Sequence, residues 1–210
     1  VAEAVGIDAV IQVGVDVSSS EEAVRIAHDW PQVAAAVALH PNEAPRIDAD
    51  GGRLALERAW DRIAQLAPDD RVVAIGETGM DFFRTEDTGR AAQEESFRRH
   101  IRLAKEVGKT LVIHDRDAHD DILRVMDDEG APPRVVMHCF SGDADFAREV
   151  TERGWYCSFA GVVTFKNATA TARERVKAGF ILNRIAEKEG IKVSNEDITQ
   201  RIIAIAQQRN

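Results

Sequence analysis

Cysteine is scarce in the 210-residue sequence, which contains only Cys139 and Cys157. Both lie in apolar runs, so we expect reduced core thiols in a cytoplasmic protein and no disulfide scaffold. No run approaches the about 18 apolar residues of a membrane-spanning helix, and no charged-then-apolar leader is visible, so neither a membrane protein nor a secreted one is expected. Neither G-x-G-x-x-G nor G-x-x-x-x-G-K-[ST] occurs, which leaves a dinucleotide site or a P-loop without support.

Basic residues are outnumbered, with 27 Lys+Arg against 36 Asp+Glu and a net charge of −9. Residues 169–210 hold 8 basic and 5 acidic residues, whereas residues 1–168 hold 19 and 31. The acidic charge of residues 1–168 argues against non-specific binding of nucleic acid through a basic face. It still allows a substrate whose phosphate group binds to a metal ion in a cleft. The asymmetry predicts that the C-terminal segment is a different kind of element.

Six near-continuous apolar runs alternate with five amphipathic segments. Continuous apolar runs are typical of strands covered on both faces, as in parallel sheets. The alternation predicts an α/β fold with a parallel sheet, either an open doubly wound sheet or a (β/α) barrel. The expected strands are 9–15, 33–39, 71–76, 109–114, 134–139 and 155–163. The expected helices are 20–29, 53–67, 91–107, 118–129 and 143–153.

The pattern of strands stops after Asn167. Residues 173–189 form one amphipathic segment that ends before Gly190, a typical C-terminal stop. The sequence SNED at 194–197 is typical of an N-cap and opens a second helix that runs to about Gln208. We therefore predict two domains, an α/β portion at 1–168 and an α-helical hairpin at 169–210.

Four consecutive predicted strands end in a polar side chain that can bind a metal ion. They are His40, Glu77, His114 and His138. The carboxyl ends of parallel strands meet at one mouth, so the fold would bring all four into one cleft, and imidazoles with a carboxylate suit Zn²⁺ or Mn²⁺. A single histidine at a strand end is more often a hydrogen-bonded core or surface group, but four corresponding positions favour a metal site. The remaining histidines fall in helical segments and are interpreted as surface or packing residues: His28, His100 and His119.

Other polar residues follow the same strand ends. Asp81 is expected on a loop that overhangs the mouth, and Arg116 could bind a phosphate or carboxylate oxygen with its planar guanidinium. Asp115 and Asp117 could orient a metal-bound imidazole or could be solvated loop charges. Ser141, followed by glycine, predicts a turn that exposes backbone N–H groups to an anion.

The motifs at these positions resemble the TatD family of metal-dependent deoxyribonucleases. They are ALHPNEA at 38–44, GETGMDF at 76–82, VIHDRDA at 112–118 and MHCFSG at 137–142. The resemblance extends over residues 1–167 and implies a (β/α) barrel of the amidohydrolase type, incomplete here with about six strands. It also implies metal-dependent hydrolysis of DNA phosphodiester bonds, from single strands or free ends, with two divalent ions (Zn, Mn or Mg).

The resemblance also implies roles for individual residues. Glu77, His114 and His138 would be metal ligands, with Glu77 bridging two ions. His40 and Arg116 would line the substrate pocket together with Asp81. Asp81 and Glu77 would be catalytic, and Ser141 would bind substrate.

Two family motifs are absent from the sequence. There is no H-x-H pair anywhere, and no T-D-x-P follows Lys166. Half of the ligands that the family uses are therefore missing, and a homo-oligomeric partner or a complementing chain segment would have to supply them.

Residues 173–208 resemble the C-terminal arm region of trigger factor, a ribosome-associated chaperone. This leaves two alternatives to an active nuclease: a catalytically inactive chimeric or fragment protein, and a polypeptide-binding module formed by the C-terminal helices. Hydrolysis of a C–N bond in a cyclic amide is a further alternative chemistry. Many such sites bridge their metals with a modified lysine, so Glu77 at this strand end favours the phosphodiester.

Overall fold

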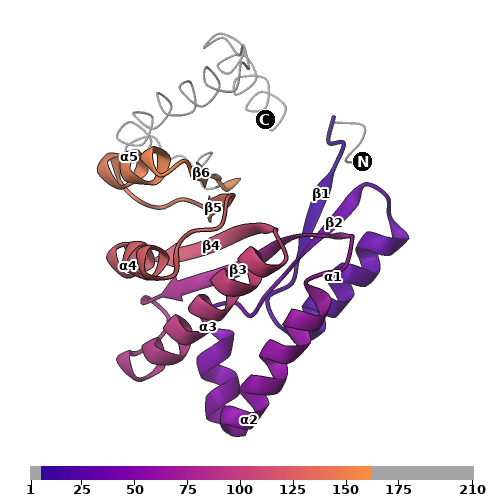
Figure 1. Cartoon of the computed structure of the whole chain (residues 1–210), viewed down its shortest axis with the longest axis horizontal. Coiled ribbons are helices and arrows are strands. Elements are labelled where there is room, and N and C mark those ends of the chain that lie inside the picture. The colour runs from indigo at the N-terminus through magenta and orange to yellow at the C-terminus, as the bar shows by residue number, and fades with distance from the viewer. Residues whose placement is uncertain (1–5, 162–210) are drawn as a thin grey trace, which may run out of the picture. The chain divides into compact units, whose positions relative to one another are not determined.

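The structure is a computed structural model that describes residues 6–161 (Figure 1). The predicted C-terminal hairpin lies outside the described residues, and so does the end of the last predicted strand. The chain groups into two compact units. The first comprises Val1–Ser141 and Glu152–Ala160 and contains every described strand, and the second contains α5 except for its last residue.

The described strands form one six-stranded parallel sheet in which the spatial order follows the order along the chain. This arrangement confirms the predicted α/β class and agrees with an incomplete (β/α) barrel. The described strands do not close into a barrel. The strands are β1 (Val10–Val13), β2 (Val33–Val37), β3 (Val72–Asp81), β4 (Thr110–Arg116), β5 (Val135–His138) and β6 (Tyr156–Cys157).

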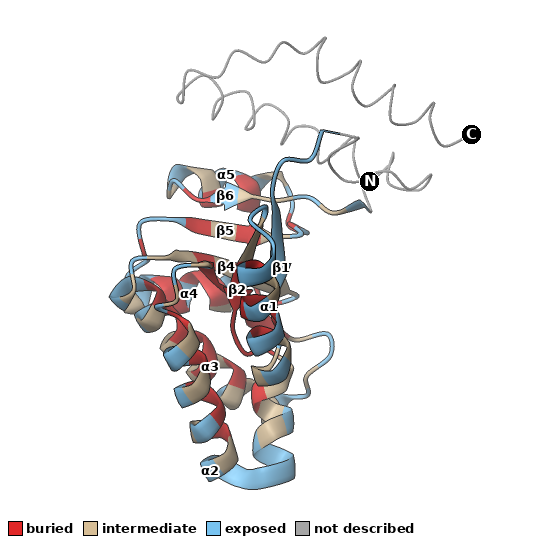
Figure 2. Cartoon of the chain, turned by 90° about the vertical axis from the view of Figure 1, so that its right-hand side faces the viewer, coloured by how far each residue is buried: buried red, intermediate tan, exposed pale blue. Residues whose placement is uncertain are grey.

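The helices are α1 (Val17–Asp29), α2 (Glu43–Leu66), α3 (Asp87–Glu106), α4 (His119–Glu129) and α5 (Ala144–Glu152). Parallel strands in sequential order, joined by right-handed crossovers, place successive helices on the same face of a sheet. Helices α1 to α4 follow this rule and turn their buried sides toward the strands (Figure 2). None of the described helices has the length and apolar character needed to cross a membrane.

The core lies between the sheet and these helices. The last residues of β2 are fully buried, and so are Ile75 of β3 and Ile113 of β4. Phe97 and Ile101 on α3 close the core from the helix side with no exposed surface. Each such side chain contributes about 1.5–3 kcal/mol to folding by leaving water.

Helix α1 begins three residues before the predicted start. The Asp16 carboxylate accepts a hydrogen bond from the Ser19 backbone N–H at 2.7 Å, and the Ser19 hydroxyl oxygen accepts one from the Asp16 backbone N–H at 3.0 Å. This reciprocal cap satisfies backbone donors that would otherwise have no partner and starts the helix at Val17.

Helix α2 also begins earlier than predicted, at Glu43 instead of residue 53. Gly52 adopts a non-helical conformation, with φ 70° and ψ −179°, so two helical segments meet at a kink there. The glycine pair at 51–52 is a weak helix signal, which is why the first segment is missed by periodicity.

Strand β3 extends beyond its predicted end at Gly76 and includes Glu77 and Asp81. The register with β4 shifts between Ile75 and Thr78, and pairing then resumes up to Asp81, opposite Arg116. Asp81 is therefore the buried last residue of a strand, and its expected place on an overhanging loop is wrong. Pairing with β4 carries the strand through GETGMD, which lacks the apolar pattern of a strand.

Candidate metal centre

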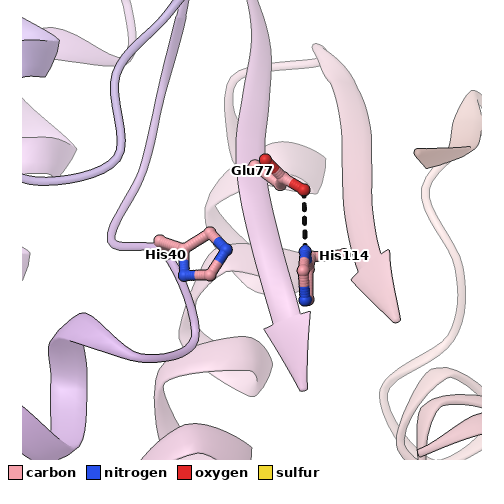
Figure 3. A group of neighbouring side chains, drawn as sticks. All are labelled: His40, Glu77 and His114. Carbon is pink, nitrogen blue, oxygen red and sulfur yellow. Dashed lines mark hydrogen bonds and ion pairs between the residues drawn. The ribbon is translucent and has the colours of Figure 1, made fainter. Parts of the chain in front are cut away.

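Three predicted residues come together at the carboxyl ends of β2, β3 and β4. Suitable ligand atoms of His40, Glu77 and His114 all lie within 4.8 Å of one another. Figure 3 shows Glu77 and His114 on neighbouring strands and His40 on the segment that follows β2. The rings of His40 and His114 meet edge to face, with centroids 4.6 Å apart.

Glu77 and His114 form the closest pair in the group. Glu77 Oε1 lies 2.8 Å from His114 Nδ1, and the two side chains are 15% and 21% exposed. The register shift in β3 occurs where Glu77 stands, and such irregularities re-aim side chains next to functional sites.

Asp81 forms a hydrogen bond with the other nitrogen of the His114 ring. Its Oδ2 lies 3.2 Å from His114 Nε2, and its Oδ1 accepts hydrogen bonds from the backbone N–H groups of Phe83 and Arg84. A carboxylate that fixes the far side of an imidazole orients it as a ligand. These contacts favour an orienting role for Asp81, and its predicted catalytic role stays a prediction.

The charges of the site follow from these contacts. Burial opposes ionisation of Glu77, but the hydrogen bond from His114 and the charges of three nearby histidines outweigh it and lower the pKa of Glu77. Burial also opposes the charge on His114, yet the hydrogen bond and charge of Glu77, with the charge of Asp81, raise the pKa of His114. A divalent cation bound here would displace the proton that Glu77 and His114 share.

His40 differs from His114 in its charge and in its contacts. Burial, and then repulsion from His114, lower the pKa of His40 and so favour the neutral form of its ring. The Asn42 backbone N–H donates to His40 Nδ1 at 3.3 Å, which assigns the ring proton to Nε2. A ring in this tautomer donates a hydrogen bond, so the contact favours the predicted substrate-pocket role of His40.

His138 stands on β5 directly opposite His114 of β4. Its Nε2 lies 3.0 Å from Cys139 Sγ, and its Nδ1 lies 3.3 Å from Ser158 Oγ. The ring is not part of the group within 4.8 Å, as far as the described residues show. Its role as a ligand stays a prediction, supported by its place on the adjacent strand.

The remaining predicted residues lie further along the same edge of the sheet. Arg116 ends β4 and places its guanidinium 3.8 Å from the ring centroid of Phe83. Ser141 is exposed, and its hydroxyl donates to the Asp115 carbonyl at 3.4 Å. Asp115 contacts His119 at 2.6 Å rather than a residue of the His40–Glu77–His114 group. These contacts leave the predicted substrate-binding roles of Arg116 and Ser141 as predictions.

Two polar residues of the site are missed by sequence reasoning. Gln93 on α3 is buried, and its carbonyl oxygen accepts from the Asp81 backbone N–H at 3.1 Å. Asn42 donates to Asp81 Oδ2 at 3.3 Å, and its carbonyl oxygen accepts from Gln93 and from Thr85. Gln93 could have been noticed as a polar residue on the buried side of α3, but the sequence does not show which residue it contacts.

The donor set suits a divalent metal ion. Imidazole nitrogen and carboxylate oxygen are common ligands of zinc and manganese. Two ligands of one zinc ion lie at most about 4.2 Å apart, because each bond is about 2.1 Å long. The 2.8 Å pair of Glu77 and His114 meets this limit, with Asp81 as its support.

A sequential parallel α/β sheet with an imidazole–carboxylate group at its carboxyl edge defines a protein of the (β/α)-barrel class with a candidate metal site. A family model described as "TatD related DNase" matches residues 1–185, and the chain belongs to this family. The resemblance inferred from the motifs is thereby confirmed. A second model, "Bacterial trigger factor protein (TF) C-terminus", matches residues 164–210.

Relatives agree with this assignment. An "Uncharacterized metal-dependent hydrolase TatD" of Mycobacterium tuberculosis is 43% identical over 171 residues, which cover 80% of this chain and 62% of that protein. A "3'-5' ssDNA/RNA exonuclease TatD" of Citrobacter rodentium is 33% identical over 174 residues, which cover 82% and 63%. The chain therefore spans less than two thirds of the length of these relatives.

Solved structures support the fold. A TatD homologue from Escherichia coli K12, YJJV, superposes with a TM-score of 0.66 at 23% identity, covering 78% of this chain and 60% of that one. A TatD family hydrolase from Entamoeba histolytica gives a TM-score of 0.62 at 21% identity and covers 75% and 53%.

Proposed function

We propose that the chain is part of a metal-dependent hydrolase that cleaves phosphodiester bonds of single-stranded DNA. The observation that carries this proposal is the Glu77–His114 pair at the carboxyl edge of the sheet, supported by Asp81, in a member of the TatD related DNase family. The exonuclease name of the Citrobacter rodentium relative supports a nucleic-acid substrate.

The residues of the site have separate tasks in this proposal. Glu77 and His114 hold the metal, with His138 of the next strand as a further ligand. A bound divalent ion would act as a Lewis acid on a phosphoryl oxygen. His40 Nε2–H and the Arg116 guanidinium donate hydrogen bonds to the other phosphate oxygens and so orient the scissile bond.

We propose that the remaining metal ligands come from residues outside this 210-residue chain. The chain lacks the H-x-H and T-D-x-P motifs and spans 62% of its Mycobacterium tuberculosis relative. A complementing chain segment or a second subunit would supply these groups, and the family's two-ion centre would then be complete.

Metal binding and hydrolysis test the proposal together. Dialysed protein is titrated with Mn²⁺ and with Zn²⁺ by calorimetry, and digestion of an end-labelled single-stranded oligonucleotide is followed in the same buffer. Glu77→Gln and His114→Ala should each weaken metal binding by at least about tenfold, since even an outer contact to a ligand is worth that much.

Glu106→Gln, at the exposed end of α3, is the matched control and should leave both measurements unchanged. Equal metal affinity in Glu77→Gln and in the unaltered protein would contradict the metal centre. Metal binding without digestion would contradict nuclease activity of this chain by itself and leave the metal centre standing.

A second candidate function concerns the C-terminal segment. The match of residues 164–210 to the trigger factor C-terminus favours binding of extended polypeptides. Suppression of aggregation of a reduced, unfolded protein by the full chain, and its loss on truncation at residue 163, would support this function.

A further inference from the structure

Phe83 is an exposed aromatic side chain next to the candidate metal centre. It follows Asp81, the last residue of β3, by two positions, and it is 63% exposed. A single exposed apolar side chain is common on protein surfaces and needs no function. The surroundings of Phe83 give it more weight than its exposure alone.

The backbone of Phe83 is fixed to the centre. Its N–H donates to Asp81 Oδ1 at 3.1 Å, while Asp81 Oδ2 lies 3.2 Å from the His114 ring. One buried carboxylate thus joins the loop that bears Phe83 to a candidate metal ligand. The preceding residue, Phe82, donates its N–H to the Arg116 carbonyl at 2.9 Å, which ties the loop to β4 as well.

A positively charged side chain, Arg116, packs against the ring of Phe83. The Arg116 guanidinium lies 3.8 Å from its centroid, close enough for a cation–π interaction. Many arginines on the outer helices instead pair with carboxylates, as Arg98 does with Glu94. A flat apolar face beside a guanidinium suits a nucleotide, whose base stacks on an aromatic ring and whose phosphate accepts from arginine.

We propose that Phe83, backed by Arg116, is a stacking platform for an unpaired nucleobase next to the scissile phosphate. This inference rests on the proposed nuclease function and deepens it, because it names the part of the substrate that the loop recognises. A base within a duplex has both faces covered by its neighbours, so the platform selects single strands or frayed ends. Stacking tolerates any base, so the platform carries little sequence preference.

Binding to two strands that differ only in their bases tests the platform. The probes are a fluorescein-labelled oligothymidylate and an abasic strand of equal length, measured by anisotropy without divalent metal. Phe83→Ala should weaken oligothymidylate binding by about 5- to 150-fold, the range that one stacked base gives. The same variant should leave abasic-strand binding unchanged, and Phe83→Tyr should restore oligothymidylate binding.

Trp30→Ala is the matched control, since Trp30 is equally exposed, at 62%, but caps the far end of α1. An equal loss on both strands would overturn the platform and show a backbone or structural role, and no loss on either would overturn it too. Hydrolysis of methyl p-nitrophenyl phosphate, which has no base, is measured in parallel with added Mn²⁺. Its absence in the unaltered protein would count against catalysis by this chain by itself, while the platform is still decided by the two strands.

Discussion

At the scale of single residues, His100 shows how a buried histidine can support a site without belonging to it. The side chain is 2% exposed in the middle of α3. Its Nε2 accepts from the Leu39 backbone N–H at 3.1 Å, and its Nδ1 donates to the Ser96 carbonyl at 2.6 Å. Because both nitrogens are engaged in the neutral form, His100 holds the segment that leads into His40.

This arrangement predicts a pH dependence of stability. Burial lowers the pKa of His100 to about 4, below the value of about 6.5 in an unfolded chain. Between these values the unfolded chain binds a proton that the folded chain does not. The contribution of His100 is therefore complete above pH 6.5 and falls by about 3 kcal/mol as the pH drops to 4.

Urea unfolding of the unaltered protein and of His100→Gln at pH 7.5 and pH 4.5 measures this term. The unaltered protein should lose about 2.5 kcal/mol more free energy of unfolding than the variant over this interval. Leu54→Ala, which removes an exposed side chain that does not titrate, is the control and should lose as much as the unaltered protein. Identical losses in the unaltered protein and His100→Gln would assign the acid sensitivity to other groups.

Residue-scale predictions from sequence succeed where a rule of the fold applies. The sequence predicts that His40, Glu77, His114 and His138 meet because the carboxyl ends of parallel strands share an edge, and the structure brings the first three within 4.8 Å of one another. No such rule predicts that Gln93 or Phe83 belongs to the site. Their importance depends on which atoms a helix and a loop bring to Asp81, and that is a property of tertiary packing.

At the scale of elements, β3 and β4 approach each other more closely than strands with side chains could. Gly79 has φ +136°, and a Cβ placed there would lie 2.1 Å from the His114 carbonyl oxygen. The glycine therefore lets β4 bring His114 toward Glu77. The motif GETGMD combines the ligand with the glycine that makes room for its partner strand.

Gly79→Ala should destabilise the protein by about 2–4 kcal/mol, because the new methyl group meets backbone and the conformation disfavours a side chain. Metal affinity should fall as His114 is displaced. Gly108→Ala is the matched control, since Gly108 also has positive φ, +66°, but open space around its Cβ position. It should cost about 1 kcal/mol and leave metal binding unchanged. Thermal and urea unfolding with metal titration would decide, and equal effects of both variants would contradict the close-approach argument.

Elements were predicted well where their hydrophobic pattern is continuous. β4 and β5 match their apolar runs to within two residues, although only alternate side chains along them are fully buried. The predicted ends of helices and strands are wrong where interactions other than hydrophobic burial set them. A side-chain cap starts α1 early, and cross-strand pairing carries β3 through polar residues.

At the scale of the whole molecule, charge limits how nucleic acid can bind. The chain carries a net charge of −9, and described arginines such as Arg53, Arg98 and Arg124 pair with carboxylates. Among residues 6–161, the arginines engaged in this way are not free to contact phosphates. Affinity should therefore come from the metal centre and base stacking more than from release of counterions.

The salt dependence of oligothymidylate binding checks this expectation. With one to three phosphate contacts, the slope of log K against log salt concentration should lie between about −0.7 and −2. Removing one contact in Arg116→Ala should reduce the slope by about 0.7. Anisotropy titrations from 50 to 300 mM KCl provide the measurement, and a slope steeper than about −4 would show an extended basic surface instead.

The sequential order of the strands has a consequence for how the chain acquires its structure. Each described strand pairs only with strands that precede or follow it directly, and successive pairing residues such as Ala74 and Thr110 are a few tens of positions apart. None of the six described strands needs a distant part of the chain in order to pair. Each unit can dock on its predecessor as it leaves the ribosome, so the sheet can grow from the N-terminal side in step with translation.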